Sequence, residues 1–522
     1  MSNKKIKRSL CLVLAMLILL AGCGVNPPAE STNAADNTKN EGDAVKKDSL
    51  VFSINGDIAT LDPKLTKDTV TFLVLFQMFD PLIREEPDGT LAPGLAEKWE
   101  VSEDGMEILF TIRKGVKFHN GDTMTVEDVA YSLNRAIQSS YTTAMTNNMD
   151  SAEVVDENTV KLRLKNVYAP ILSCLTSSSL GIVSKKAAEE AGEDFARNPV
   201  GTGPFKFVEW KNGERIVMER FDDHYRGPAA IKDLTFKIMT DKNTAAIALE
   251  KGEIDVLYDP DSADTQSLKD NENIAYYEGA SVYYYHILFN TEKGKFSDKK
   301  LRQAVSYAID REALILGGLD GYGVPVECPM PPTVFGYQKD FKNNPYDPAK
   351  AKQLMAEAGY PDGFTVKLKC NQSSIYTKPT EVLQEQLRQI GINSEIELME
   401  RSTYIQDVTT DCNYEITLYM VSCTIPDADF VVTKRLHSSM IGGGNNFSRV
   451  SIPELDKLIE EARTSQDPNV RYELYGKISE MVKEEAPLIP IMSELADIAA
   501  NKNIKGVYSS SSERHYVYNY SW

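Results

Sequence analysis

The chain has 522 residues, a quarter of them charged, and its formal net charge at pH 7 is −19. A surface this acidic repels polyanions, so nucleic acid is excluded as a favoured partner. The length exceeds what one hydrophobic core supports and predicts two or three domains.

Residues 1–22 are typical of an export signal. Basic residues between positions 4 and 8 precede an apolar segment, 10–20, that is too short to span a bilayer comfortably. The segment ends in Leu20-Ala-Gly-Cys23, which resembles a bacterial lipobox, where the signal peptidase cuts before a diacylated cysteine. We therefore expect lipidation of Cys23 and anchoring at the extracytoplasmic face of the cell membrane, the periplasmic side if the cell is Gram-negative.

The residues after Cys23 are poor in large apolar side chains up to position 47. Such a segment cannot bury enough surface to offset its ordering entropy, so residues 23–47 are predicted to be a flexible tether. The folded body is expected to begin near Ser49. No later stretch of eighteen apolar residues occurs, so no further membrane crossing is expected.

Short strand patterns and longer helical patterns alternate through the body, which predicts α/β layers with mixed sheets. Thr125 and Asp128 form a predicted capping box, and Asp347 caps a helix that ends at Gly359. The other predicted helices are 377–390, 453–464 and 468–485. The predicted strands are 50–54, 108–112, 160–164, 206–210, 216–220, 234–239, 392–398 and 414–421.

Cysteine usage does not indicate a disulfide framework. Cys11 would be removed with the signal and Cys23 lipidated, which leaves an odd number of cysteines without a CxxC pair. At least one thiol is therefore expected to be free, and all five can remain unpaired in a chain of this size. The five are Cys174, Cys328, Cys370, Cys412 and Cys423.

Six blocks of the body occur in an order that resembles the family 5 extracellular solute-binding proteins of ABC importers, the peptide and nickel class. The longest runs from Leu91 to Arg135 and includes Ala92-Pro-Gly-Leu-Ala96 and Phe110-Thr-Ile-Arg113. The others are Pro199–Phe205, Asn290-Thr291, Arg302–Arg311, Ala358–Pro361 with Leu387–Ile392, and Ala486–Pro490.

The resemblance implies a type II periplasmic-binding-protein-like α/β fold with two lobes, a hinge and three domains. Domain I would comprise 48–80, 199–290 and 498–522, domain II 81–198, and domain III 291–497. The chain would cross between the lobes near Asn290 and near Ala496. The implied function is capture of a peptide or peptide-like ligand in the cleft and its delivery to an ABC permease and ATPase, by a monomer that needs no cofactor or metal and is not an enzyme.

Candidate ligand contacts follow one of the predicted strands. Many relatives have a tryptophan and, three residues later, an aspartate that pairs with the α-ammonium of the peptide, and Val421 and Thr424 stand at those positions here. A free ammonium then requires Asp427 or Asp429, or the ligand has none. The alternative role of both aspartates is turn formation and helix capping. Tyr419 precedes them on the strand and is a further candidate.

Three positions outside that strand bear on the ligand. Arg401 stands where oligopeptide binders carry a cleft tryptophan, so it can meet an anionic group or remain a solvated surface arginine. Tyr141 stands where those binders have a cleft tyrosine, with a half-buried structural tyrosine as the alternative. Cys370 stands near the position at which dipeptide binders carry an arginine that holds the ligand carboxylate. A thiol cannot make that bidentate pair, so an oligopeptide is expected rather than strictly a dipeptide.

Three rival functions remain open at the level of sequence. A nickel or metal-chelate binder exists in the same family, but the five histidines lack ligand spacing, and only His437 lies near the expected cleft. An exported hydrolase is disfavoured because the chain contains no G-x-S-x-G, HExxH or Walker motif. A signalling receptor or a peptide-binding chaperone on the same scaffold is the third.

Overall fold

The computed structural model describes residues 47–87, 89–443, 445–510 and 514–522. The predicted export signal, Cys23 and the predicted tether up to residue 46 lie outside the described residues. Among the helices of the described ranges, none combines the length and the apolar composition that a bilayer crossing requires.

A seven-stranded sheet, the first sheet, gathers strands from three distant parts of the chain in the order β12-β19-β11-β1-β10-β9-β8. The central strand β1 pairs in parallel with β10 and β11, while β9, β8 and β19 run antiparallel to their neighbours. The strands are β1 (Ser49–Ile54), β8 (Phe205–Lys211), β9 (Arg215–Arg220), β10 (Asp233–Ile238), β11 (Val256–Tyr258), β12 (Ile274–Tyr277) and β19 (Ile498–Asn501); the helices α1 (Thr69–Met78), α6 (Lys242–Glu250) and α7 (Thr265–Asp270) belong to the same region. We call 47–80, 199–277 and 498–522 the first-sheet region.

A four-stranded antiparallel sheet, the second sheet, is contained in residues 81–198, the second-sheet region. Its helix α2 begins with the predicted capping box, in which Thr125 accepts from the backbone of Asp128 and the Asp128 carboxylate accepts from the backbone of Thr125. The elements are β2 (Ile83–Glu85), β3 (Leu91–Pro93), β4 (Ala96–Val101), β5 (Glu107–Ile112), α2 (Val126–Ile137), α3 (Thr143–Thr146), β6 (Met149–Val154), β7 (Thr159–Leu164), α4 (Ile171–Cys174) and α5 (Lys185–Ala191); β2 and β3 pair separately as a two-stranded ribbon.

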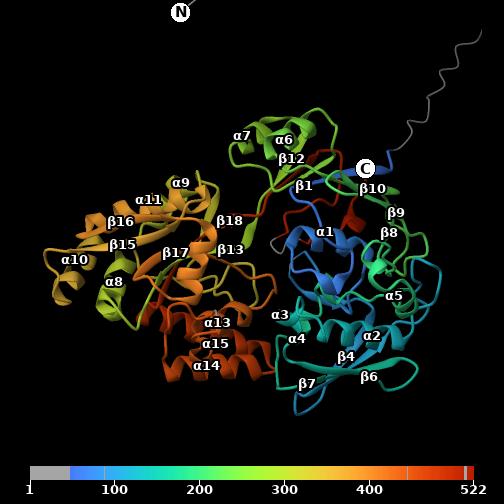
Figure 1. Ribbon diagram of the computed structural model, residues 1–522, viewed down its shortest axis with the longest axis horizontal. Coiled ribbons are helices and arrows are strands. Elements are labelled where there is room, and N and C mark those ends of the chain that lie inside the picture. The colour runs from blue at the N-terminus through green and yellow to red at the C-terminus, as the bar shows by residue number, and fades with distance from the viewer. Residues whose placement is uncertain (1–46, 88, 444, 511–513) are drawn as a thin grey trace, which may run out of the picture. The chain divides into compact units, whose positions relative to one another are not determined.

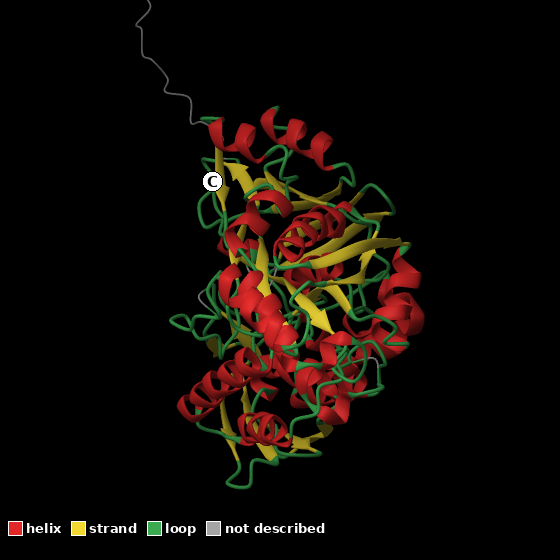
Figure 2. Ribbon diagram, turned by 90° about the vertical axis from the view of Figure 1, so that its left-hand side faces the viewer, coloured by secondary structure: helices red, strands yellow, loops and turns green. Residues whose placement is uncertain are grey.

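A six-stranded mixed sheet, the third sheet, has the order β14-β18-β13-β17-β15-β16. Helices lie on two sides of it in Figure 1, with α9 and α11 above and α13 to α15 together below, and Figure 2 shows red helices on either side of yellow strands. The elements are β13 (Ala280–Phe289), α8 (Lys299–Ala308), α9 (Arg311–Gly318), β14 (Gly323–Pro325), α10 (Pro348–Glu357), β15 (Phe364–Asn371), α11 (Ser374–Gln389), β16 (Ile392–Met399), α12 (Arg401–Ile405), β17 (Ile416–Ser422), α13 (Asp429–Leu436), α14 (Pro453–Thr464), α15 (Pro468–Glu485) and β18 (Leu488–Leu495). We call 280–495 the third-sheet region.

Two chain crossings connect the first and third sheets. The first lies between β12 and β13 and the second between β18 and β19. They touch, because the backbone N–H of Ala496 donates to the carbonyl of Gly279 at 2.8 Å. The chain leaves the first sheet after Tyr277 and enters the third sheet at Ala280, and it leaves the third sheet after Leu495 and re-enters the first at Ile498. The sequence of β13 predicts a strand but not the sheet to which the strand belongs. Its pairing with β17 and β18 assigns it to the third sheet.

Most of the predicted elements agree with the structure. The six predicted strands up to residue 239 are β1, β5, β7, β8, β9 and β10, and the helices α14 and α15 have the predicted bounds. The helix α11 begins at Ser374, three residues before its predicted start, and continues through Pro379. The strand β17 begins at Ile416, two residues later than predicted.

Candidate ligand site

A small cavity is lined by residues of all three regions. Helix α1 contributes Thr69, Phe72 and Phe76 from the first-sheet region, and the segment after β17 contributes Thr424 and Ile425 from the third-sheet region. The remaining lining residues are Met145, Ser177 and Arg514. The cavity therefore lies at a junction that only the folded chain creates.

The guanidinium of Arg514 ties this junction together. It donates to the hydroxyl of Thr176 at 2.6 Å and to the carbonyl of Thr424 at 3.3 Å, and it forms an ion pair with Glu85. Both charged side chains are almost fully buried. Because its donors already have protein partners, Arg514 is a structural clamp between regions.

A second cavity, of about 250 Å³, shares Thr69 with the first and extends along the two crossings. The hydroxyls of Thr69 and Tyr283 lie 3.4 Å apart across the boundary between the first-sheet and third-sheet regions. Carboxylates of Glu494 and Asp497 also line it. Burial raises the pKa of both, that of Asp497 to about 6. The cavity is thus polar and rich in hydrogen-bond acceptors.

The predicted residues at the end of β17 divide into two groups. Thr424 lines the first cavity, and Tyr419 is half-buried, with its ring stacked on Tyr404 at 6.2 Å between centroids. Val421 is 3 % exposed and packs in the core of the third-sheet region. The valine at the position of the relatives' tryptophan is therefore core.

The two aspartates after Thr424 are engaged by protein groups. Both carboxylate oxygens of Asp427 accept from the guanidinium of Arg471, and one also accepts from the backbone N–H of Asp429. The Asp429 carboxylate pairs with Arg463 at 3.2 Å and accepts from Thr433. Both aspartates are at most 3 % exposed. Asp427 thus closes a turn and pairs with an arginine, and Asp429 is the first residue of α13, whose N-cap, Ala428, makes no side-chain capping bond.

Arg401 and Tyr141 are both exposed, but in different surroundings. Arg401 opens helix α12, and its charge acts on the phenols of Tyr376 and Tyr419, whose pKa values it lowers against the larger rise caused by burial. Tyr141 follows α2 and is 46 % exposed, and it lines neither of the two cavities. Neither Arg401 nor Tyr141 therefore contributes to the walls of the two cavities.

Metal-ligating side chains do not converge. His437 hydrogen bonds to Ser439 and lies 3.2 Å from Glu460. In the part of the chain that the structure describes, no group of three or more histidines, cysteines or acids has the geometry to hold a metal ion.

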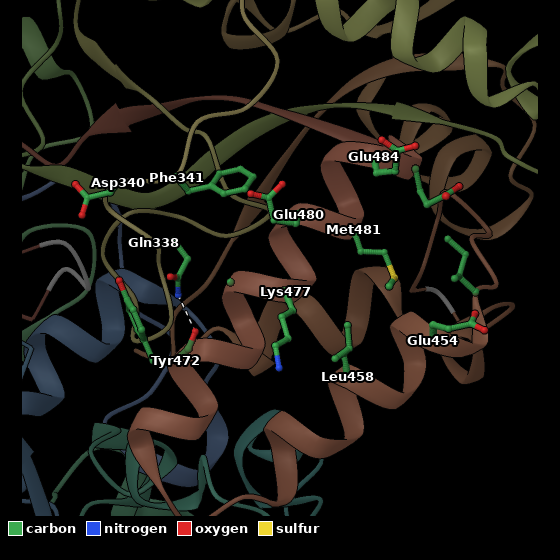
Figure 3. A pocket seen from close by; sticks show the side chains of 13 residues that line it. Gln338, Asp340, Phe341, Glu454, Leu458, Tyr472, Lys477, Glu480, Met481 and Glu484 are labelled. Atoms are coloured by element: carbon green, nitrogen blue, oxygen red, sulfur yellow. Dashed lines mark hydrogen bonds between the residues drawn. The ribbon is translucent and has the colours of Figure 1, made fainter.

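A separate groove of about 1100 Å³ lies on helices α14 and α15 (Figure 3). Its floor is apolar and acids flank it, and Gln338 closes one end by donating to the carbonyl of Tyr472 at 2.8 Å. All of its lining residues come from 338–341 and 452–485. Since only one region contributes, the groove does not match a site shared between regions.

Comparison with known proteins identifies the scaffold. Residues 90–442 match the bacterial extracellular solute-binding proteins, family 5 (middle region). The chain belongs to this family. It is 29 % identical over 470 residues to the glutathione-binding protein GsiB of Salmonella choleraesuis (88 % of this chain, 91 % of the relative), and 29 % identical over 540 residues to heme-binding protein A of Haemophilus influenzae (97 % of each).

Solved structures of family 5 proteins superpose over most of the chain. HbpA2 from Haemophilus parasuis has a TM-score of 0.84 at 26 % identity, covering 91 % of this chain and 99 % of its own. The periplasmic binding protein DppA from Helicobacter pylori, in complex with the peptide STSA, has a TM-score of 0.74 at 27 % identity, covering 91 % and 98 %. The fold is the type II periplasmic-binding-protein fold, as the sequence predicted, and the chain is a substrate-binding protein of the ABC-transporter class.

One residue of this family 5 protein escaped the sequence analysis. Arg435 lies on α13 as a half-buried residue, and its guanidinium, with Nε and Nη1 fully buried, lies 4.4 Å from the ring centroid of Phe447. The available signal was the absence of an acid three or four positions away in the sequence, where Val431, Val432, Ser438 and Ser439 stand. An arginine on a partly buried helix without such an acid requires a partner from elsewhere.

Proposed function

We propose that this protein captures a small peptide-like ligand between its first-sheet and third-sheet regions and delivers it to an ABC permease and its ATPase. The observation that carries the proposal is the pair of adjoining cavities that share Thr69. Their walls come from both regions, and the facing hydroxyls of Thr69 and Tyr283 stand on opposite sides of the boundary. A ligand placed there would contact both regions at once.

Closure around the ligand supplies the transport signal in this proposal. Two short crossings, joined by the bond between Ala496 and Gly279, form a narrow connection that suits a hinge. A ligand that contacts both regions binds the closed form more tightly than the open form, so it shifts the population toward closure. The permease then recognises the closed shape, and no covalent step is needed.

The proposed location is the extracytoplasmic face of the membrane, with a lipid on Cys23 as anchor and the body as a monomer. The support is the lipobox-like Leu20-Ala-Gly-Cys23 together with the basic and apolar segments before it. Labelling with radioactive palmitate tests the anchor, since Cys23→Ser should abolish incorporation while the wild-type chain is labelled.

The ligand class is proposed from the site and from the relatives. GsiB is named for glutathione and DppA binds a tetrapeptide, so both take peptide-like ligands. Cys370 is 1 % exposed and its thiol points to the carbonyl of Asn371, so it offers a ligand carboxylate no cation. An oligopeptide or a modified peptide therefore fits better than strict dipeptide recognition.

Calorimetry and thermal unfolding of the exported protein test the proposal. Glutathione or trialanine should bind and raise the melting temperature, because a ligand that binds only the folded state stabilises it. Histidine-chelated nickel should leave the melting temperature unchanged. A rise with nickel chelate and none with either peptide would replace the peptide proposal by the metal-chelate alternative, and mass spectrometry of copurified material checks the outcome independently.

A further inference from the structure

A nucleophilic cluster lies at the end of helix α13, and none of its residues lines the two cavities. The hydroxyl of Ser439 lies 2.7 Å from Nδ1 of His437, and Nε2 of the same ring lies 3.2 Å from a carboxylate oxygen of Glu460. Serine, histidine and carboxylate therefore form one continuous hydrogen-bonded chain. A hydroxyl is activated for nucleophilic attack by this arrangement, in which a base contacts the nucleophile and a third group orients the base.

The backbone of Ser439 determines which ring nitrogen of His437 carries the hydrogen. Its N–H donates to Nδ1 at 3.1 Å, so Nδ1 presents a lone pair and the hydrogen of the neutral ring is on Nε2. Nε2–H then donates to Glu460, and Nδ1 also accepts the hydroxyl hydrogen of Ser439. Compared with the usual triad of serine, histidine and acid, the two ring nitrogens exchange roles while the order of proton transfer is kept.

The imidazole of His437 is held in place from both sides of the chain. His437 ends α13, where its backbone N–H donates to the carbonyl of Thr433 at 3.1 Å, and its side chain caps the one-turn helix Ser438–Met440. Its carbonyl accepts from the side-chain amide of Asn446 at 3.0 Å. The base is therefore positioned before any substrate arrives, as efficient proton transfer requires.

The exposed fractions and charges of the cluster suit a reaction at the hydroxyl. His437 is 7 % exposed, whereas Ser439 is exposed, so solvent and small molecules reach the hydroxyl while the ring is shielded. A second carboxylate, that of Asp456, has an oxygen 4.0 Å from Nδ1 and accepts from the backbone N–H of Ser438 at 2.8 Å. The acids Glu460 and Asp456 thus both face the ring and stabilise the imidazolium that forms when Nδ1 takes a proton.

We propose that Ser439 is an acyl-accepting nucleophile with His437 as its general base, and that the protein hydrolyses activated esters there. Oγ of Ser439 attacks the ester carbonyl carbon, its proton passes to Nδ1 of His437, and the bond from that carbon to the leaving oxygen breaks as the leaving group takes the proton. Water then attacks the acyl-serine, gives a proton to Nδ1, and releases the carboxylic acid while the proton returns to Oγ. Activated esters are the substrate class because their leaving groups depart without a separate acid. Glu460 is a positioning residue that acts through His437.

Labelling with an alkyl fluorophosphonate and hydrolysis of p-nitrophenyl acetate by the exported full-length protein test the proposal. Peptide mapping by mass spectrometry should find the phosphonyl and acetyl groups on Ser439, and Ser439→Ala should abolish both the label and the hydrolysis. Ser297→Ala is the matched control. Ser297 is likewise an exposed serine of a one-turn helix, but its hydroxyl donates to the carbonyl of Gly294 at 2.8 Å, so this variant should react like the wild type.

Variants of the base and of the positioning acid test their separate roles. His437→Asn should slow the labelling of Ser439 about 100-fold, at the lower end of what general-base catalysis contributes. Its side-chain oxygen can still cap the one-turn helix, so the fold should be kept. Glu460→Gln should slow labelling about ten-fold through loss of a charge-assisted hydrogen bond, and Glu460→Asp should recover part of that loss. A purely structural role of Glu460 would change the melting temperature and not the labelling rate.

The wild-type protein alone already decides the central point, because mapping compares the labelling rates of Ser439 and Ser297 in one sample. Equal rates at the two serines, or labelling of His437→Asn at the wild-type rate, would overturn the proposal. Ser439→Ala should retain the affinity for glutathione or trialanine, since Ser439 lines neither cavity. Peptide binding and ester hydrolysis can therefore succeed or fail independently of one another.

Discussion

Arg471 holds Asp427 with two hydrogen bonds, of 2.7 Å from Nη2 to Oδ1 and 2.9 Å from Nη1 to Oδ2. The two side chains are 6 % and 1 % exposed and stand on helix α15 and on the loop after β17. The pair therefore fixes the loop that carries Thr424, which lines the first cavity. Asp427, a candidate ligand contact in the sequence, is thus engaged by a buried arginine of the same chain.

Asp427→Asn should cost about 3 to 5 kcal/mol of unfolding free energy, because it leaves the buried guanidinium of Arg471 without a charge partner. Urea unfolding followed by circular dichroism measures the change. Glu385→Gln, which breaks an exposed pair with Arg388, should show no measurable change. If Asp427→Asn retained full stability and lost ligand affinity, Asp427 would be a ligand contact after all.

Gly363→Ala should destabilise the protein much more than Gly359→Ala. Both glycines have positive φ, +79° and +89°, so each alanine pays about 1 to 2 kcal/mol of left-handed strain. A Cβ at Gly363 would also lie 2.0 Å from the carbonyl oxygen of Gly391, whereas one at Gly359 meets nothing within 4 Å. The difference between the two variants, about 1 to 3 kcal/mol by urea unfolding, isolates the overpacking. Equal losses would contradict the close approach at Gly391.

Asp497→Asn should stabilise the protein above pH 6 and leave it unchanged below pH 4. Burial raises the pKa of Asp497 from 3.8 to about 6, so the unfolded chain releases this proton more easily and stability falls as the pH rises between those values. The asparagine removes that loss and still accepts from Tyr276. Allowing for partial exposure, the gain at pH 7.5 is about 1 to 2 kcal/mol. A gain of the same size at pH 3.5 would assign the effect to something other than ionisation.

His286→Phe should flatten the loss of stability in acid. Burial lowers the pKa of His286 from 6.5 to about 3. Between those pH values the unfolded chain binds a proton at this histidine and the folded chain does not, so the free energy of unfolding falls as the pH falls. The wild type should lose about 2 to 3 kcal/mol more than the variant between pH 7 and 4.5, since one pKa unit is about 1.4 kcal/mol. Urea midpoints across this range measure it. The pKa values of His119 and His515 are also lowered, to about 4 and 3, so the stability of both proteins still decreases with falling pH.

The five described cysteines should resist iodoacetamide in the native protein and react in 6 M guanidinium chloride without a reducing agent. All five are free and buried, as the odd count in the sequence allowed. Burial raises the pKa of Cys328 to about 11, and that of Cys174, Cys370 and Cys423 as well, so reactive thiolate is scarce. Peptide mapping by mass spectrometry reads the result. Any of the five that labels only after reduction would reveal a disulfide.

The sequence by itself determined the family, the α/β class and most of the elements. Local patterns sufficed for these, because a capping box such as Thr125 with Asp128, or a proline at the first helical position such as Pro348, acts within a few residues. The order of blocks between Leu91 and Pro490, which resembles the order in the family, identified the scaffold for the same reason, since the residues that form turns and helix caps are adjacent in the sequence.

Only the tertiary structure decided which charged side chains pair with other groups of the protein and which have no such partner among the described residues. Asp427 finds its partner 44 residues away and Arg514 pairs with Glu85 across 429 residues, while Arg435 finds none among the described residues. Hydrophobic periodicity assigns a residue to one face of a helix or strand but does not predict which residues, distant in the sequence, it contacts in the fold. Charge pairing depends on those neighbours, so the choice between structural anchor and ligand contact is made by packing.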